Sequence, residues 1–242
     1  MGEVYQAWDS RLCRSVAIKA LPVRFATDSR LTRQLEREAR IVASLNHPHI
    51  CAVYDVGRQD GLSYIVMEHL DGETLADRLA RGPLPLGDVL KYGSEIADGL
   101  DKAHRTGITH QDLKPANIVL TKSGAKLLDF GTAALRHGQS ASFGSVHRST
   151  EDDSTADAVG GTVPYMAPEQ LEGKATDARS DVFAFGLVVH EMLTAQRAFV
   201  GDDQAGLIAA VLSAEPAVAS ALRSDIPPAL QRIVSRCLSK DP

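Results

Sequence analysis

Alternating and near-continuous apolar runs dominate the first 70 residues of the chain. Their lengths and their period of two are typical of strands, and the polar residues 59–61 indicate a turn. The predicted strands are residues 2–8, 15–21, 50–56 and 62–68. Residues 31–45 have the helical period instead, with an apolar face formed by Leu31, Leu35, Ala39, Val42 and Ala43. The first part is therefore predicted to be a small antiparallel sheet with one helix packed on it.

Beyond Gly72 the pattern changes to the period of an α-helix. The predicted helices are residues 74–81, 88–105, 180–194, 203–214 and 227–238. On the second of them the apolar stripe comprises Val89, Gly93, Ile96, Ala97, Leu100 and Ala103. Residues 135–159 are polar and lack apolar periodicity, which predicts a long mobile loop. The expected class is α+β, a single domain with a β-rich lobe over residues 1–70 and a mainly helical lobe over residues 71–242.

A β-hairpin is predicted in the second part from two short apolar runs that enclose a tight turn. Its strands are residues 118–120 and 125–128, and its turn is residues 122–124. Asp112 and Asn117 precede the first strand, and Asp129 follows the second. Because a hairpin brings its two ends together, these oxygen-bearing side chains are expected to converge. Such a group favours magnesium and phosphate chemistry.

Composition and charge exclude several other classes of protein. The chain has 242 residues, 44% of them apolar, so it can bury a substantial core. Its net charge of −5, with acidic and basic residues interspersed, gives no basic surface for nucleic acid. Cys13, Cys51 and Cys237 lie far apart and lack zinc-ligand spacing, which argues against a disulfide framework and against a zinc site.

The sequence favours a soluble protein of a reducing, cytoplasmic compartment. No secretory leader opens the chain, and it contains no Asn-x-Ser/Thr sequon. The most apolar segment, residues 182–193, is interrupted by a histidine and a glutamate and is too short to span a membrane. A membrane anchor in a longer protein stays open.

Several motifs, taken together and in order, make the chain resemble a protein kinase of the bacterial, eukaryotic-like Ser/Thr type across almost its whole length. They are VAIK at residues 16–19, Glu38 in the helix that follows, HQDLKPAN at residues 110–117, DFG at residues 129–131, GTVPYMAPE at residues 161–169 and DVFAFG at residues 181–186. Alone, the first is usually only a strand end, and Asp-Phe-Gly is more often a turn than a metal site. Their order and separations favour the kinase interpretation, which implies a two-lobed protein-kinase-like fold.

The resemblance implies ATP as the phosphoryl donor and Mg²⁺ as the metal ion, with Mn²⁺ as a second candidate. Lys19 would reach the α- and β-phosphates, and Glu38 would fix it as an ion pair. Asn117 and Asp129 would supply oxygen ligands to the metal. Phosphoryl transfer depends mainly on positioning and charge neutralisation, which gives a physical reason for gathering these residues.

The resemblance also implies roles on the acceptor side. Asp112 is the candidate base for the substrate hydroxyl, and Lys114 would steady the γ-phosphate as charge develops. Thr162 would lie near both, under the residue that follows the acceptor. Lys114 and Thr162 are typical of Ser/Thr kinases, whereas tyrosine kinases usually carry other residues at both places. The expected partners are therefore proteins with Ser or Thr acceptors.

An adenine pocket and an internal column follow from the same resemblance. The residues implied around the base are Val4, Ala17 and Val119, with Met67 as gatekeeper, Glu68 to Leu70 as the hinge and Gly2 as the trace of a glycine-rich loop. The column that would join the lobes comprises Val42, Val53, His110 and Phe130, anchored by Asp181. Ordinary core packing is the alternative interpretation for the apolar members.

Gln111 departs from the family pattern, because most regulated kinases have Arg at this place. That Arg supplies a guanidinium for a phosphate on the activation loop, and an amide matches neither its charge nor its fork. We therefore expect activity not to depend strongly on phosphorylation of the activation segment, residues 129–169. Loss of activity after phosphatase treatment would contradict this expectation.

The two ends of the chain depart from the pattern as well. Gly2 enters at the last glycine of the phosphate-covering loop, and the chain ends before the Arg that pairs with Glu169 in the family. A Glu that is fully buried without its partner costs on the order of 3–5 kcal/mol. The expectation is a fragment that is less stable than a longer chain.

Two functions of different classes are weighed. The first is an active ATP-dependent protein Ser/Thr kinase; the second is a pseudokinase that binds nucleotide or partners without catalysis. Gln111 and the missing ends favour the second mildly, whereas the presence of every catalytic residue named above argues against it. Small-molecule kinases of the aminoglycoside phosphotransferase type are a poor alternative, because they lack the Ala-Pro-Glu segment at residues 167–169.

Overall fold

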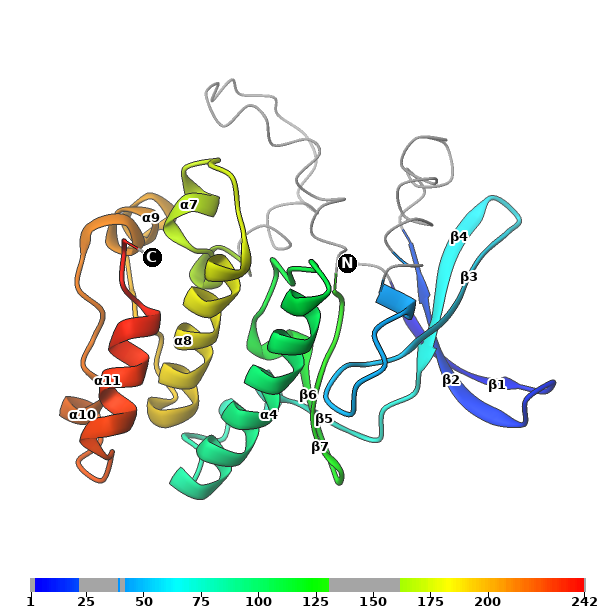
Figure 1. Ribbon diagram of the computed structural model, residues 1–242, viewed down its shortest axis with the longest axis horizontal. Coiled ribbons are helices and arrows are strands. Elements are labelled where there is room, and N and C mark those ends of the chain that lie inside the picture. Colours follow the sequence, from blue (N-terminus) through cyan, green and yellow to red (C-terminus); the bar gives the residue numbers. More distant parts are fainter. Residues whose placement is uncertain (1–2, 22–38, 40–41, 131–161, 242) are drawn as a thin grey trace.

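The computed structural model describes residues 3–21, 39, 42–130 and 162–241 (Figure 1). The strands of this part are β1 (Val4–Asp9), β2 (Arg14–Ala20), β3 (Val53–Gln59), β4 (Leu62–Glu68), β5 (Gly72–Thr74), β6 (Ile118–Thr121) and β7 (Gly124–Leu127). Its helices are α3 (Leu75–Leu79), α4 (Leu86–Arg105), α7 (Pro168–Leu171), α8 (Ala178–Thr194), α9 (Gln204–Ser213), α10 (Ala219–Leu222) and α11 (Pro228–Cys237). Short 3₁₀ turns are η1 (Pro115–Asn117) and η2 (Val163–Tyr165). The α+β class with a small sheet lobe and a mainly helical lobe is confirmed; the boundary between residues 70 and 71 stays a prediction.

The first lobe contains a four-stranded antiparallel sheet with the order β1-β2-β4-β3. The turn between β3 and β4 has two residues in the left-handed region, Asp60 at φ 50° and Gly61 at φ 78°. Such turns match the twist of a hairpin, so the polar turn predicted here is confirmed. Of the predicted helix at residues 31–45, Ala39 and Val42 are described and buried. Ala43 was assigned to the same face but is exposed.

The strand predicted at residues 50–56 begins later than expected, at Val53. Ile50 instead forms an isolated parallel bridge with Leu127 of β7. The amide of Cys51 donates to the carbonyl of Leu127 at 2.9 Å, and the amide of Leu127 donates to the carbonyl of His49 at 2.9 Å. The apolar run over residues 50–56 is therefore divided between two sheets, which a pattern along one segment cannot reveal.

The second sheet has the order β5-β6-β7 and contains the predicted hairpin. Thr121 pairs with Gly124, so the turn proper is Lys122–Ser123. Strand β5 was not predicted, because three residues carry no readable period. It lies so close to β6 that a Cβ on Gly72 would stand 2.2 Å from the carbonyl oxygen of Leu120. Only glycine allows this approach of the two backbones.

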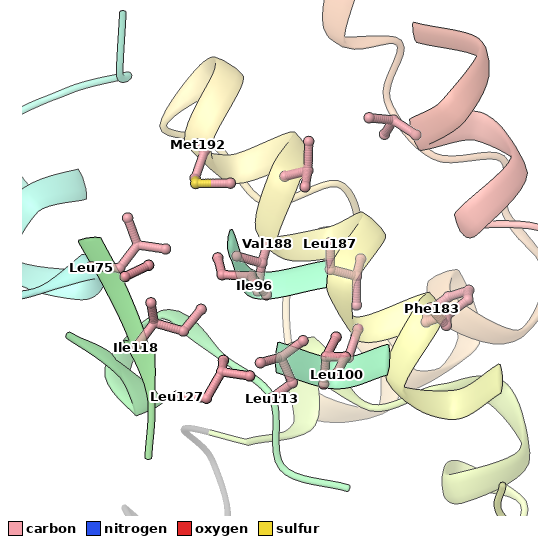
Figure 2. Close-up of a cluster of buried hydrophobic side chains, with 14 of the residues drawn as sticks. Leu75, Ile96, Leu100, Leu113, Ile118, Leu127, Phe183, Leu187, Val188 and Met192 are labelled. Carbon is pink, nitrogen blue, oxygen red and sulfur yellow. The ribbon is translucent and has the colours of Figure 1, made fainter. Parts of the chain in front are cut away.

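The core of the helical lobe lies between α4, α8 and the β6–β7 hairpin (Figure 2). Ile96 of α4 and Met192 of α8 are fully buried, and Ile118 and Leu127 of the hairpin pack in the same cluster. Helix α8 is buried along most of its length, as expected of a helix that is apolar nearly all round. The hairpin is therefore packed against α4, which packs in turn against α8.

The apolar stripe of α4 needs one correction. Ala97 is exposed, and Gly99, which was not assigned to the stripe, is buried. A Cβ on Gly99 would lie 3.0 Å from a methyl carbon of Leu127 and 3.3 Å from the carbonyl oxygen of His49. The absence of a side chain at this position lets α4 lie close to Leu127 of the second sheet. Among the helices of the described residues, none is long and apolar enough to cross a membrane.

Replacing Ile96 by Ala should lower the free energy of unfolding by about 2–5 kcal/mol, because the side chain is fully buried and leaves a cavity. Leu90 lies on the same helix but is 50% exposed, so Leu90→Ala should change this free energy by only about 0.5 kcal/mol. Urea denaturation of both variants measures the difference. Equal losses would show that α4 does not pack as described.

Candidate active site

The carboxylate of Asp181, in the first turn of α8, holds the loop at residues 110–117. Its Oδ2 accepts the backbone N–H of His110 at 2.7 Å, and its Oδ1 accepts the backbone N–H of Gln111 at 2.7 Å. The ring Nε2 of His104 lies 2.7 Å from the same Oδ2. Asp181 is 1% exposed, so these partners replace the water that its charge would otherwise bind. The start of the loop is thereby fixed to the core helix.

The backbone of the loop has an unusual conformation at Gln111. Gln111 has φ 63°, a conformation that side-chain-bearing residues seldom adopt. His110 is fully buried, and its Nδ1 accepts the backbone N–H of Asp112 at 3.3 Å. The His110 ring also packs on Phe130 with 4.6 Å between centroids. His110 and Phe130, predicted members of the internal column, are in contact, and Asp181 anchors the backbone of the first.

Asp112, Lys114, Asn117 and Thr162 form one hydrogen-bonded group. The ammonium of Lys114 lies 2.9 and 3.0 Å from the two carboxylate oxygens of Asp112 and donates to Oγ1 of Thr162 at 2.7 Å. The amide nitrogen of Asn117 donates to the backbone carbonyl of Asp112 at 2.8 Å and to its Oδ2 at 3.1 Å. The sequence placed all four in one site, and the fold brings them together.

Burial makes this group rigid. Lys114 is 4% exposed, Asp112 6% and Asn117 5%. An ion pair taken out of water keeps its charges only when further hydrogen bonds satisfy them, and Asn117 and Thr162 supply such bonds. A carboxylate held in this way has a fixed direction, which suits a group that must receive a proton from a positioned hydroxyl.

Asp129 lies at the other end of the hairpin and binds Lys19 of β2. The Lys19 ammonium is 2.5 Å from Oδ2 of Asp129. The backbone N–H of Leu128 donates to the carbonyl of Asn117 at 2.8 Å, which holds the two ends of the hairpin side by side. Glu38, the ion-pair partner predicted for Lys19, lies outside the described residues. Lys19 therefore has a described carboxylate partner other than the predicted one.

The donor set at the hairpin ends fits a divalent cation of the magnesium type. Asp129 offers a carboxylate and Asn117 an amide oxygen, both hard ligands. Since the Nδ2 of Asn117 donates to Asp112, its Oδ1 remains the acceptor of the amide. Within the part of the chain that the structure describes, no group of three or more His, Cys, Asp or Glu side chains could hold a metal ion. The set is thus one in which other oxygens complete the coordination.

Strand register places four of the predicted nucleotide-binding residues on one face of the first sheet. Val4 pairs with Lys19, and Ala17 pairs with Met67. Directly paired residues share a face, and so do residues two apart in a strand. Val4 is 60% exposed on this face, whereas Ala17 and Met67 are half-buried. Gly2, the remaining candidate on this strand, lies outside the described residues.

Val119 faces the same region from the second sheet. Its neighbours Ile118 and Leu120 pack into the helical core, so alternation turns Val119 to the opposite side. Val119 pairs with Lys126, whose ammonium binds both carboxylate oxygens of Glu68 at 2.8 Å. The face that carries Val119 is therefore the face that meets the predicted hinge.

The hinge is held by its side chains as well as by its backbone. The backbone N–H of Glu68 donates to the carbonyl of Ala52 at 2.9 Å, and the Ala52 N–H lies 3.3 Å from Oε2 of Glu68. Burial, reinforced by the charge of Glu68, raises the pKa of the neighbouring Cys51 thiol to about 12, so this cysteine is an apolar packing residue. Leu70, the last hinge residue predicted, is half-buried.

The segment after Thr162 is held by hydrogen bonds to α8. Tyr165 of η2 donates to Oε2 of Glu191 in α8 at 2.7 Å. Burial, first of all, raises the pKa of Tyr165 and the pKa of Glu191. Glu169, predicted to lack a partner, is half-buried and accepts a hydrogen bond from the hydroxyl of Ser180. The loss of stability expected for a fully buried, unpaired Glu therefore does not apply to Glu169.

Several residues that shape the site were not found from the sequence. They are His104, which contacts Asp181; Lys126, which binds Glu68; and Gln170 and Thr176, which contact Gln111. None of them belongs to the motifs quoted above, although Gln170 directly follows the motif at residues 161–169. The two residues of each pair lie 58 to 77 positions apart in the sequence. Only the tertiary structure reveals such pairs.

Comparison with known proteins gives a family match over the whole chain. The model of the family "Protein kinase domain" matches residues 1–242. The chain is 40% identical over 248 aligned residues to the probable serine/threonine-protein kinase SCO3848 of Streptomyces coelicolor, covering 100% of this chain and 35% of that protein. It is 38% identical over 248 aligned residues to the serine/threonine-protein kinase PknB of Mycobacterium leprae, covering 100% of this chain and 38% of that protein. The chain thus spans little more than a third of the length of these curated relatives.

A solved structure gives the same match. The crystal structure of the PknI kinase domain of Mycobacterium tuberculosis is similar to this chain with a TM-score of 0.71 and 30% sequence identity. The similarity covers 99% of this chain and 84% of that chain. It therefore extends over both lobes.

Asp181→Asn should lower the free energy of unfolding by about 1–3 kcal/mol, because an amide group cannot accept both backbone N–H bonds and leaves one buried donor unpaired. Asp177 caps the same helix from an exposed position, and Asn caps a helix as well as Asp does. Asp177→Asn is therefore the matched control, expected within about 0.5 kcal/mol of the unaltered chain. Denaturant unfolding compares the two; a larger loss in the control would show that Asp181 is not the anchor.

Proposed function

This chain belongs to the protein kinase family, and from that premise we propose that it transfers the γ-phosphoryl group of ATP to Ser and Thr hydroxyls of protein substrates. The observation that carries the proposal is the buried group in which Lys114 joins Asp112 to Thr162. An acid at hydrogen-bonding distance from a lysine and beside a hydroxyl-lined acceptor segment suits phosphoryl transfer to an alcohol. The relatives named above are described as serine/threonine-protein kinases, which supports the same acceptor class.

Membership of the family implies the use of ATP and a divalent metal ion. We propose Mg²⁺, with Mn²⁺ able to replace it, because the available ligands are a carboxylate and an amide oxygen. Asp129 and Asn117 would hold it. When bound, such an ion neutralises charge on the phosphate oxygens.

The nucleotide would lie against the sheet face that carries Val4, Ala17 and Met67, opposite Val119 of the hairpin. The hinge from Glu68 to Leu70 would present backbone groups to the adenine. Gly2 would belong to the phosphate-covering segment. Residues 1–70 and 71–242 would then act as the two lobes around this site, with residues 129–169 as the activation segment.

Lys19 would bind the phosphates, and Glu38 would hold Lys19 in place. Its ammonium binds Asp129 at 2.5 Å, a position that a phosphate oxygen would contest. If Asp129 binds the metal ion instead, Lys19 would be able to bind the α- and β-phosphates and Glu38. The pair Lys19–Asp129 would thus be a resting contact that bound nucleotide replaces.

Asp112 would accept the proton of the acceptor hydroxyl while Lys114 shifts from Asp112 toward the transferring phosphoryl group. The two distances of 2.9 and 3.0 Å show that the ammonium is already beside the acid. Thr162 keeps the lysine directed toward the acceptor segment. The charge that develops in transfer is then met by a pre-positioned cation, which is the most effective form of electrostatic stabilisation.

A pseudokinase would retain nucleotide binding without transfer. No structural feature of the described residues favours that alternative, since Lys19, Asp112, Lys114, Asn117 and Asp129 are all in the group just described. We place the activity in the cytoplasm, in keeping with the three free cysteines of the structure.

Asp112→Ala should lower transfer of labelled phosphate from Mg-ATP to a mixture of Ser- and Thr-containing peptides by about 10²–10⁴-fold, because the proton acceptor is lost. Binding of ATP, measured as nucleotide-dependent thermal stabilisation, should persist. Asp101 is exposed on α4, and Asp101→Ala is the matched control with unchanged transfer. Equal transfer by the Asp112→Ala variant and the unaltered chain would favour the pseudokinase.

Lys19→Met should weaken ATP binding about 10- to 100-fold, the expected loss of one charged hydrogen bond to phosphate. Lys91 is exposed on α4 and serves as the control through Lys91→Met.

Chelation of divalent ions with EDTA should abolish transfer by the unaltered chain, and added Mg²⁺ should restore it. Transfer that persists in EDTA would contradict the proposed metal site.

A further inference from the structure

The side chain of Gln111 is hydrogen-bonded to two threonine hydroxyls. Its Nε2 lies 2.9 Å from Oγ1 of Thr109 and 3.3 Å from Oγ1 of Thr176. Thr109 belongs to the same loop, whereas Thr176 lies 65 residues away, between α7 and α8. The amide therefore joins the loop that carries Asp112 to a different segment of the helical lobe.

The backbone of Gln111 is joined to the same segment. Gln170 of α7 donates from Nε2 to the carbonyl of Gln111 at 2.9 Å, and its Oε1 accepts the backbone N–H of Ala167 at 2.9 Å. Gln170 is thus fixed at both ends of its amide, one end on its own helix and the other on the loop. Together with Asp181 on the backbone N–H, these contacts hold Gln111 from three directions.

Such restraint has a physical reason. Gln111 has a positive φ, and a residue with a side chain keeps such a conformation only when its surroundings determine it. Asp112 is the next residue, so a change in the backbone of Gln111 would shift the Asp112 carboxylate relative to Lys114. The contacts with Thr109, Thr176 and Gln170 are between neutral groups, so added salt should not loosen them. The one anion that holds the Gln111 backbone, Asp181, is buried in the fold.

We propose that Gln111, Thr176 and Gln170 form an uncharged clamp that positions Asp112 for transfer without help from a phosphate. The inference rests on the proposed function and assigns to Gln111 and Thr176 the part of positioning residues. In kinases with Arg at this place, a guanidinium takes its counter-charge from a modified loop. Here two hydroxyls and two amides hold the loop.

The kinetic test compares variants that remove single hydroxyl or amide groups. Thr176→Val and Gln111→Ala should each lower kcat about 10-fold with the KM for ATP unchanged, because the displaced group acts in the chemical step and not in nucleotide binding. Thr176→Ser keeps the hydroxyl, so its kcat should equal that of the unaltered chain. Thr194 is a half-buried residue at the far end of α8 whose hydroxyl binds two backbone carbonyls. Thr194→Val is therefore a matched control with unchanged kcat.

The double variant tests whether the two residues act on the same contact. The double variant Gln111→Ala with Thr176→Val should have the same kcat as Gln111→Ala alone, because Gln111→Ala already removes the hydrogen bond to Thr176 as well as the one to Thr109. Effects that multiply, or an unaltered kcat in Thr176→Val, would overturn the clamp. Phosphatase treatment of the unaltered chain should leave kcat within about two-fold, and a larger loss would overturn the phosphate-independent part.

A measurement without catalysis separates the clamp from the proposed function. Backbone amide hydrogen exchange at residues 110–112 should be faster in Thr176→Val than in the unaltered chain and unchanged in Thr194→Val. If the unaltered chain transfers no phosphate but the exchange rates differ in this way, the proposed function fails and the clamp stands. Equal exchange in Thr176→Val and the unaltered chain would overturn the clamp, whatever the activity.

Discussion

One buried carboxylate determines where the proposed catalytic group lies. Asp181 is 1% exposed and accepts two backbone N–H groups of the loop at 2.7 Å each. An ion removed from water costs several kcal/mol unless it is fully paired, so any displacement of the loop would leave this charge unsatisfied. Its place in the first turn of α8 helps, because the amino end of a helix favours a negative charge. The packing of α8 in the core therefore fixes the positions of His110 and Gln111.

The hairpin carries that rigidity to the second half of the site. Its strands pack against α4 and share one buried cluster with α8 (Figure 2). Asn117 and Asp129, the groups that would meet a metal ion, lie directly before and after the hairpin in the sequence. The hydrogen bond from Leu128 to Asn117 keeps those ends together. On its other face Lys126 binds Glu68, so the same short sheet also holds the segment that leads from the first lobe to the second. The catalytic and the nucleotide sides are fixed by one element, which ties their geometries to each other.

The sequence predicted those features that depend on local period and on motif. Strand β4 has the predicted bounds, and α8, α9 and α11 lie within two residues of theirs. Two of the errors have a common physical source, because each is a contact between distant segments. Ile50 left its predicted strand to pair with Leu127, and Gly99 replaced Ala97 in the core because the second sheet approaches α4 there. In the site, residue identity was readable from motifs, whereas the pairing of Lys19 with Asp129 and of His104 with Asp181 required the fold.

Gln111 shows why identity and geometry must be read together. A guanidinium at this position has no neutral form in a protein and needs an anion, so the position of its loop follows the state of whatever supplies that anion. An amide needs only hydroxyl and amide partners, and Thr109, Thr176 and Gln170 are part of the fold itself. The loop is then placed by the same packing that places Asp181 and α8. Exchange of one charged side chain for a neutral one can therefore move control of a catalytic loop from a chemical modification to the stability of the domain.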